Sequence, residues 1–124
     1  MVNHTPQDEV SLWQMYIWSG IQAIAEFPEP DGIEILRTDS GKEYRFPMTL
    51  GHYAQDMKEA MQVLTEDGQT RVTYLCHVWK NHGLDVPGAA LREGLMQLNP
   101  ENQNTLTMVC GEERFIIQTL EAIS

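Results

Sequence analysis

The sequence predicts a single α+β domain over residues 1–124, in which a mostly antiparallel sheet of about five strands carries three helices. The predicted order is α-β-β-α-β-α-β-β. Three observations lead to this fold class. The length is near the commonest domain size, and the 42% hydrophobic content is ordinary for a globular protein. Helical and strand periodicities then follow one another along the chain, and short turns join the strands near both ends.

The first element is a helix from Pro6 to about Glu26. Thr5 supplies a hydroxyl cap, Asp8 stands three residues later, and the prolines from Pro28 end the helix. Its apolar residues fall into two stripes on nearly opposite sides, so one stripe faces the core and the other needs a separate cover. We assign Val10, Trp13, Ile17, Ile21 and Ile24 to the core, and Leu12, Met15, Tyr16 and Ala23 to the second stripe.

A hairpin and a second helix come next. Residues 32–38 and 42–47 alternate as strands do, and the polar link 39–41 ending in glycine joins them. Thr49 is placed to cap a helix over residues 50–66, which has one apolar side. A third helix is predicted after the loop that follows the next strand, with Asp85 as its cap and Pro87 in its first turn.

The stretch 71–80 between these two helices is predicted to be an interior strand, because both of its faces are largely apolar. Alternation puts four residues on each face. One face carries Val72, Tyr74, Cys76 and Val78, and the other carries Thr73, Leu75, His77 and Trp79.

Two more strands close the chain. Residues 105–110 form the first, and the turn at residues 111–113 leads into residues 114–119. The segment 114–123 also fits a helix, but it is rich in strand-forming residues, so we favour a strand with a helical end. With hairpins near both ends, we expect all three helices on one face of the sheet.

Charge and cysteine content narrow the function classes. Eight basic and eighteen acidic side chains give a net charge of −10, which disfavours direct binding to nucleic acid or to an anionic membrane. The stretch 12–25 is too short and too polar to span a membrane, and the N-terminus lacks the basic start of a signal peptide. We therefore expect a soluble cytoplasmic protein with two reduced cysteines.

No catalytic, cofactor or metal site is assigned. Phosphate-binding loops, nucleophile elbows and paired cysteine motifs are missing from the sequence. Cys76 and His77 point to opposite faces of one strand, so they do not share a metal. The interior strand's more polar face is the best candidate for a ligand, with basic residues of neighbouring strands around it. The ligand-binding candidates are Arg45, Arg71, Thr73, His77 and Trp79.

Two hypotheses for function remain open. The first is a small acidic, non-enzymatic protein-interaction domain, such as an inhibitor of or adaptor for a basic protein. The second is a small-molecule-binding protein or enzyme with a pocket around His77 and Trp79. We also expect a homodimer, because the second helical stripe would leave an apolar patch in water. The predicted dimer interface is Leu12, Met15, Tyr16 and Ala23.

Overall fold

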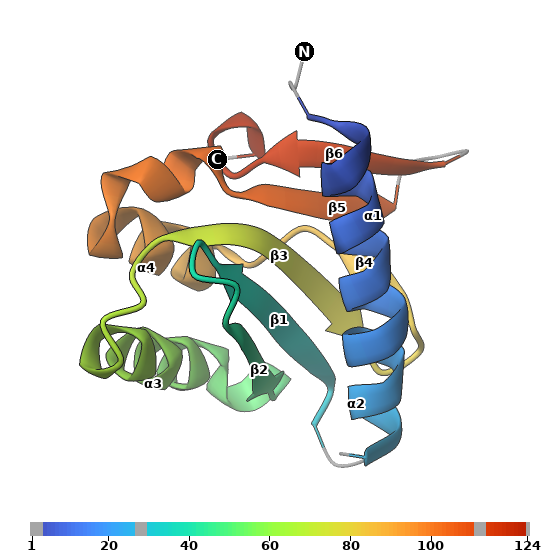
Figure 1. The fold of residues 1–124 in the computed structure, drawn as a ribbon. Coiled ribbons are helices and arrows are strands. Elements are labelled where there is room, and N and C mark those ends of the chain that lie inside the picture. Colours follow the sequence, from blue (N-terminus) through green and yellow to red (C-terminus); the bar gives the residue numbers. More distant parts are fainter. Residues whose placement is uncertain (1–3, 27–29, 111–113, 124) are drawn as a thin grey trace.

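The strand Val72–Trp79 (β3) lies inside the sheet, as its two apolar faces predict. The computed structural model describes residues 4–26, 30–110 and 114–123. The sheet order is β2-β1-β3-β5-β6, with the short strand β4 paired to β3 (Figure 1). The other strands are β1 (Gly32–Thr38), β2 (Glu43–Met48), β4 (Leu84–Asp85), β5 (Leu106–Cys110) and β6 (Phe115–Thr119).

The α+β fold class is confirmed, and the sheet is mixed. Only the pairing of β3 with β5 is parallel, while every other described pairing is antiparallel. The crossover from β3 to β5 contains the helix Ala89–Leu98, and such a long connection makes this parallel pair possible. The helices are α1 (Pro6–Gln14), α2 (Gln22–Glu26), α3 (Tyr53–Glu66) and α4 (Ala89–Leu98), and between α1 and α2 lies a π-helix, η1 (Met15–Ile21).

The expectation that all helices lie on one face is wrong. The continuous helix α1–η1–α2 covers one face of the sheet, whereas α3 and α4 cover the other (Figure 1). Each cover buries its own apolar cluster, one built on Ile35 and Cys76 and the other on Leu36 and Leu75. The physical reason is the apolar character of both faces of β3, which would leave half of the core in water under a one-sided arrangement.

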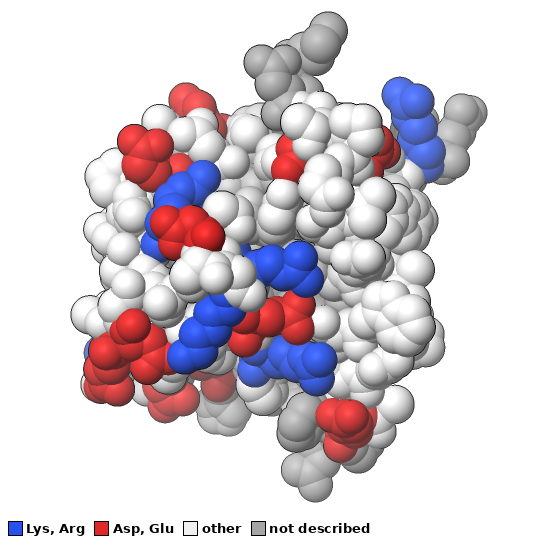
Figure 2. All heavy atoms as spheres, in the orientation of Figure 1, with Lys and Arg blue, Asp and Glu red and all other residues white. Residues whose placement is uncertain are grey.

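The first helix is also turned relative to our assignment. Leu12, Met15 and Ala23, predicted to form a dimer interface, are fully buried against the sheet, and Tyr16 is partly buried. From the predicted core stripe, Ile24 is buried as expected and Trp13 packs against the core, whereas Val10 and Ile17 are about half exposed. Figure 2 shows that the exposed surface over the middle of this helix carries no charged side chain. The predicted interface residues therefore belong to the core of one chain.

The π-helix explains the reversal. The buried positions form two rows with steps of four residues. One row is Ser11, Met15, Ser19 and Ala23, and the next is Leu12, the partly buried Tyr16, Gly20 and Ile24. In a regular α-helix, a step of four residues drifts by about 40°, so such a row would wind away from the sheet. The wider π turn at Met15–Ile21 counteracts this drift. The two rows thus stay on the sheet for the length of the helix.

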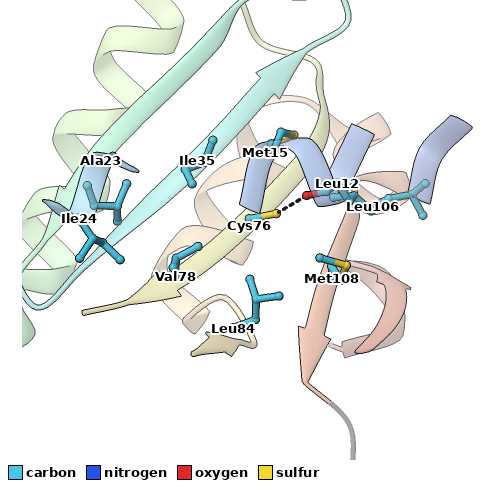
Figure 3. Close-up of a cluster of buried hydrophobic side chains, with 11 residues drawn as sticks. Leu12, Met15, Ala23, Ile24, Ile35, Cys76, Val78, Leu84, Leu106 and Met108 are labelled. Carbon is cyan, nitrogen blue, oxygen red and sulfur yellow. Dashed lines mark hydrogen bonds between the residues drawn. The ribbon is translucent and has the colours of Figure 1, made fainter. Parts of the chain in front are cut away.

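Small residues let this helix lie close to the sheet. Gly20 is buried, and a Cβ atom there would stand 2.9 Å from Cγ2 of Val78 and 3.1 Å from Cδ1 of Ile35. Figure 3 shows the apolar cluster beneath the helix, where the Sγ of Cys76 lies 3.8 Å from the carbonyl oxygen of Leu12. Burial raises the pKa of this thiol to about 12, in agreement with an inert core cysteine.

A β-bulge changes the faces at the start of β3. The register with β1 shifts between Arg37 and Thr38, so that Thr38 pairs with Val72 and Arg37 pairs with Tyr74. The extra residue, Thr73, turns Val72 onto the face of α3 and α4, where it is fully buried. Simple alternation predicted that Val72 shares a face with Cys76 and Val78. The bulge instead puts Val72 on the opposite face.

A buried asparagine joins β3 to the crossover. The Oδ1 of Asn102 accepts a hydrogen bond from the backbone N–H of Val72 at 2.8 Å. Its Nδ2 donates to the carbonyl oxygens of Thr70 and Leu95 at 2.9 and 2.8 Å. One amide side chain, in the 3₁₀ turn Pro100–Asn104, thus satisfies three backbone groups where the sheet changes from antiparallel to parallel.

The remaining boundaries depart little from the sequence analysis. Segment 114–123 contains strand β6 followed by the 3₁₀ turn Glu121–Ile123, as we favoured. Asp85 lies in β4, and α4 begins instead after Gly88. At Thr49, a 3₁₀ turn, Leu50–His52, precedes α3. The predicted breaker at residues 28–29 and the turn at 111–113 lie outside the described residues.

We expect Gly20→Leu to lower the free energy of unfolding by about 1–3 kcal/mol or more, because the side chain would collide with Val78 and Ile35. Gly51→Leu is the matched control, since a Cβ atom at Gly51 meets nothing within 4 Å. Urea unfolding of both variants measures the difference. Equal stabilities would contradict the close packing of the first helix on the sheet.

Candidate functional site

Two of the five predicted ligand residues lie together. The rings of His77 and Trp79 face α3 and α4, with centroids 4.6 Å apart. The indole Nε1 of Trp79 donates a hydrogen bond to Oδ2 of Asp85 at 2.9 Å. His77 is 3% exposed and therefore lies inside the molecule.

The other three ligand candidates lie elsewhere. Thr73 is at the bulge, where its hydroxyl donates to the carbonyl oxygen of Arg37 at 3.0 Å. Arg45 follows Tyr44, which is buried under α3, so alternation places Arg45 on the opposite face from His77. Arg71 precedes β3, with Nη1 3.3 Å from Oδ1 of Asn102. The sheet does not bring these residues into one pocket.

The nearest partner of His77 is Glu34, which the sequence analysis did not single out. The β1–β3 register places the two residues directly opposite one another. The Oε1 of Glu34 lies 2.6 Å from the Nδ1 of His77, and Glu34 is 0% exposed. A carboxylate among Ile33, Ile35 and Leu36 was the available signal, because charged side chains in an interior strand are rarely buried without a partner.

Burial sets the electrostatics of this pair. Removal from water raises the pKa of Glu34 above its ordinary value of 4.5, while the contact with His77 opposes the rise. The hydroxyl of Tyr53 lies 3.5 Å from Oε1 of Glu34, and burial also raises the pKa of Tyr53. Gly88 allows the Tyr53 ring to sit here, because a Cβ atom at Gly88 would be 2.4 Å from Cε2 of the ring. We call Glu34, Tyr53, His77 and Trp79 the buried polar cluster.

The buried polar cluster is incompletely satisfied. Within it, Oε2 of Glu34 and Nε2 of His77 are buried without a hydrogen-bond partner among the described residues. The carboxyl and imidazole groups are in contact, and their surroundings close them off from solvent. Three hollows on the described surface, with volumes of about 270, 460 and 600 Å³, are lined by other residues.

Metal binding finds no support in the part of the chain that the structure describes. No group of three or more His, Cys, Asp or Glu side chains there has an arrangement able to hold a metal ion. Cys76 faces the first helix and His77 faces α3 and α4, on opposite sides of β3. What the fold holds at this place is a buried carboxyl–imidazole pair, Glu34 and His77.

A second feature lies on the outside of the first helix. Residues 10–25 contain no charged side chain, although 21% of the whole chain is charged. Within that run, Val10 is 47%, Ile17 is 45% and Trp18 is 61% exposed. We call these three residues the helix surface. Large apolar side chains exposed on an uncharged side of a helix are typical of interaction sites.

The comparisons with known proteins assign no family: no family model and no curated protein matches this chain. No helix among the described residues is long and apolar enough to cross a membrane. The function must therefore be inferred from the buried polar cluster and from the exposed surfaces.

We expect Glu34→Gln to remove a pH dependence of folding stability. Because the pKa of Glu34 is raised, the folded chain keeps a proton that the unfolded chain releases above its ordinary 4.5. This contribution to the free energy of unfolding is fully present below that value and is lost as the pH rises through the folded-state pKa. Urea unfolding between about pH 4 and pH 8 should show the loss in the wild type and a flatter profile in Glu34→Gln.

His77→Ala is the companion variant. It removes the closest partner of a buried carboxyl group, and we expect it to lower the free energy of unfolding by about 3–5 kcal/mol at neutral pH. Combining it with Glu34→Gln should recover part of this loss, because the remaining side chain is then neutral. A His77→Ala variant as stable as the wild type would show that the pair is not coupled.

Proposed function

We propose that this chain is a non-enzymatic protein-interaction domain, an inhibitor of or adaptor for a basic protein, and that it docks that partner on the helix surface. The observation that carries the proposal is the exposed side of the first helix. Val10, Ile17 and Trp18 remain in water on an element whose other side is fully used by the core. Interfaces are commonly built around such an apolar centre, with Trp among the residues that contribute most to binding.

Charge supports a basic partner. The chain carries a net charge of −10, but the helix surface lies in a segment without charged residues. A basic protein would gain long-range attraction from the acidic body while placing an apolar patch of its own on the uncharged centre. A second copy of this chain would instead be repelled at long range, because both copies carry a net charge of −10.

A small-molecule site around His77 and Trp79 is the second candidate function, and one observation favours it. Glu34 and His77 each keep a buried polar atom without a described partner, and such atoms are what a polar ligand would satisfy. The ligand would need the cover formed by Tyr53 and Gly88 to open. The exposed surface needs no such rearrangement, so the interaction domain is the better-supported function.

We expect Ile17→Glu and Trp18→Ser to abolish binding of a basic partner without unfolding the chain, because neither side chain is buried: Ile17 is 45% and Trp18 is 61% exposed. Proteins captured from a lysate of the source organism would be identified, purified and titrated singly by calorimetry. For a true partner, Trp18→Ser should cost about 2 kcal/mol or more of binding free energy, and added salt should slow association.

Gln103→Glu is the matched control for this experiment. It adds the same charge as Ile17→Glu at an exposed position outside the first helix, in the 3₁₀ turn Pro100–Asn104. Binding that survives Gln103→Glu but not Ile17→Glu places the partner on the helix surface. Partners that bind all variants equally would contradict the proposal.

The second candidate function has its own test. A metabolite screen by thermal shift should yield a ligand if the buried polar cluster is a binding site. At 100 times its Kd, a ligand would add about 2.7 kcal/mol to the free energy of unfolding. We expect that shift to disappear in Trp79→Ala if the ligand occupies this cluster. A shift that persists in Trp79→Ala would place the ligand elsewhere.

A further inference from the structure

The two outer strands of the sheet differ in how their free edges are protected. Strand β2 carries Glu43, Arg45 and Pro47, and charges and prolines commonly prevent pairing with another strand. Strand β6 reads Phe-Ile-Ile-Gln-Thr, with no charge and no proline. Among the described strands, β6 pairs with β5 alone. Its other edge is therefore the sheet's least protected one.

The alternation of hydrogen-bonded positions along β5 and β6 shows which backbone groups of β6 point away from β5. The backbone N–H of Leu120 donates to the carbonyl oxygen of Thr105 at 3.0 Å, so these two residues are a hydrogen-bonded pair. The pairs from Leu106 with Thr119 to Cys110 with Phe115 continue without a shift in register. In an antiparallel pair, hydrogen-bonded and non-hydrogen-bonded positions alternate. Gln118 and Ile116 therefore bond to β5, while Phe115, Ile117 and Thr119 direct their N–H and C=O groups to the free edge.

This pattern is self-complementary. If a second β6 runs antiparallel with Ile117 opposite its own copy, Phe115 stands opposite the other copy's Thr119. All three outward residues of each strand then form hydrogen-bonded pairs. The same alignment brings Arg114 of each copy next to the start of the turn containing Glu121 of the other. Opposite charges thus meet at both ends of the pair, which favours this register locally in an acidic protein.

The surface beside β6 is hollowed. A hollow of about 600 Å³ is lined by Arg114 to Gln118 and Ala122, together with His4 and Glu9. Next to it, the ring of Phe115 packs on Trp13 of the first helix, with centroids 4.7 Å apart. Phe115 and Ile116 keep more than a third of their area exposed. Pairing of two copies would cover these side chains.

We propose that the chain forms a twofold dimer in which β6 of one copy pairs antiparallel with β6 of the other about Ile117, continuing the sheet from one molecule into the next. The surface differs from the helix surface, so either proposal can fail alone. Main-chain hydrogen bonds supply the attraction at short range, and the exposed apolar side chains beside the edge add burial. The charge of the two bodies opposes association, so the dimer tightens as salt is added.

The register is tested by cross-linking. Ile116 and Gln118 of opposite copies form a non-hydrogen-bonded pair, whose Cα atoms stand about 4.5 Å apart, within disulfide reach. With Cys110→Ser in every sample, we expect an equimolar mixture of Ile116→Cys and Gln118→Cys chains to form a mixed disulfide under mild oxidation. Either variant alone is the control, because like positions lie out of register. Equal cross-linking in all three samples, or none in the mixture, would overturn the proposal.

The edge itself is tested by Thr119→Pro, measured by analytical ultracentrifugation at several concentrations. Proline removes an outward N–H group, so we expect the Kd of the dimer to rise about tenfold or more. Thr119→Ala is the matched control. It loses the same hydroxyl, which accepts a hydrogen bond from the N–H of Ala122, but it keeps the N–H of residue 119 and should still dimerise. A wild type that is monomeric at high concentration overturns the dimer. Dimers lost in Trp18→Ser but kept in Thr119→Pro place self-association on the helix surface instead.

Discussion

The double-sided burial of β3 is the constraint on which the rest of the structure depends. Cys76 and Val78 on one face and Leu75 on the other are all fully buried. Each face needs a cover, because an uncovered face would expose a continuous apolar surface. The N-terminal helix supplies one cover, and the pair α3 and α4 supplies the other. The division of the core into two clusters follows from this single strand.

The cover supplied by the first helix depends on a backbone irregularity. Buried positions spaced four residues apart do not stay on one side of a regular α-helix, and the π-helix at Met15–Ile21 keeps them on the sheet. Ser19 and Gly20 then bring the helix axis close to β1 and β3. One result is that several large apolar residues are left outside, where Trp18 is the most exposed. Close packing inside and an apolar surface outside have the same cause.

The sequence was sufficient for the fold class, because strand and helix periodicities are local. The capping pair Thr5 and Asp8 and the hairpin at residues 39–41 were likewise readable from neighbouring residues. The orientation of the first helix was not readable in this way, because both of its stripes are apolar. The π-helix that decides which stripe faces the sheet has no signature in residue types. The face of Val72 depended on a bulge, which is set by pairing with a distant strand.

The buried polar cluster was predicted only in part. His77 and Trp79 share a face by simple alternation, so their proximity could be expected. Glu34 joins them through cross-strand register, and Tyr53 through the docking of α3, neither of which is encoded in local spacing. Arg45 was misplaced for the same reason. Its position in a strand was foreseeable, but the face of the sheet that it would occupy depended on pairing.

The parallel seam between β3 and β5 has a consequence for local opening. Only two residue pairs, Tyr74 with Leu106 and Leu75 with Thr107, are in register across it. The hairpin of β5 and β6 is therefore joined to the rest of the sheet by few backbone bonds and held mainly by packing, with Met108 lying against the first helix. Fewer backbone bonds therefore need to break for local opening along this seam than between β1 and β3, which pair from Gly32 to Thr38. The N-terminal helix thus clamps the C-terminal hairpin, and the two ends of the chain stabilise one another.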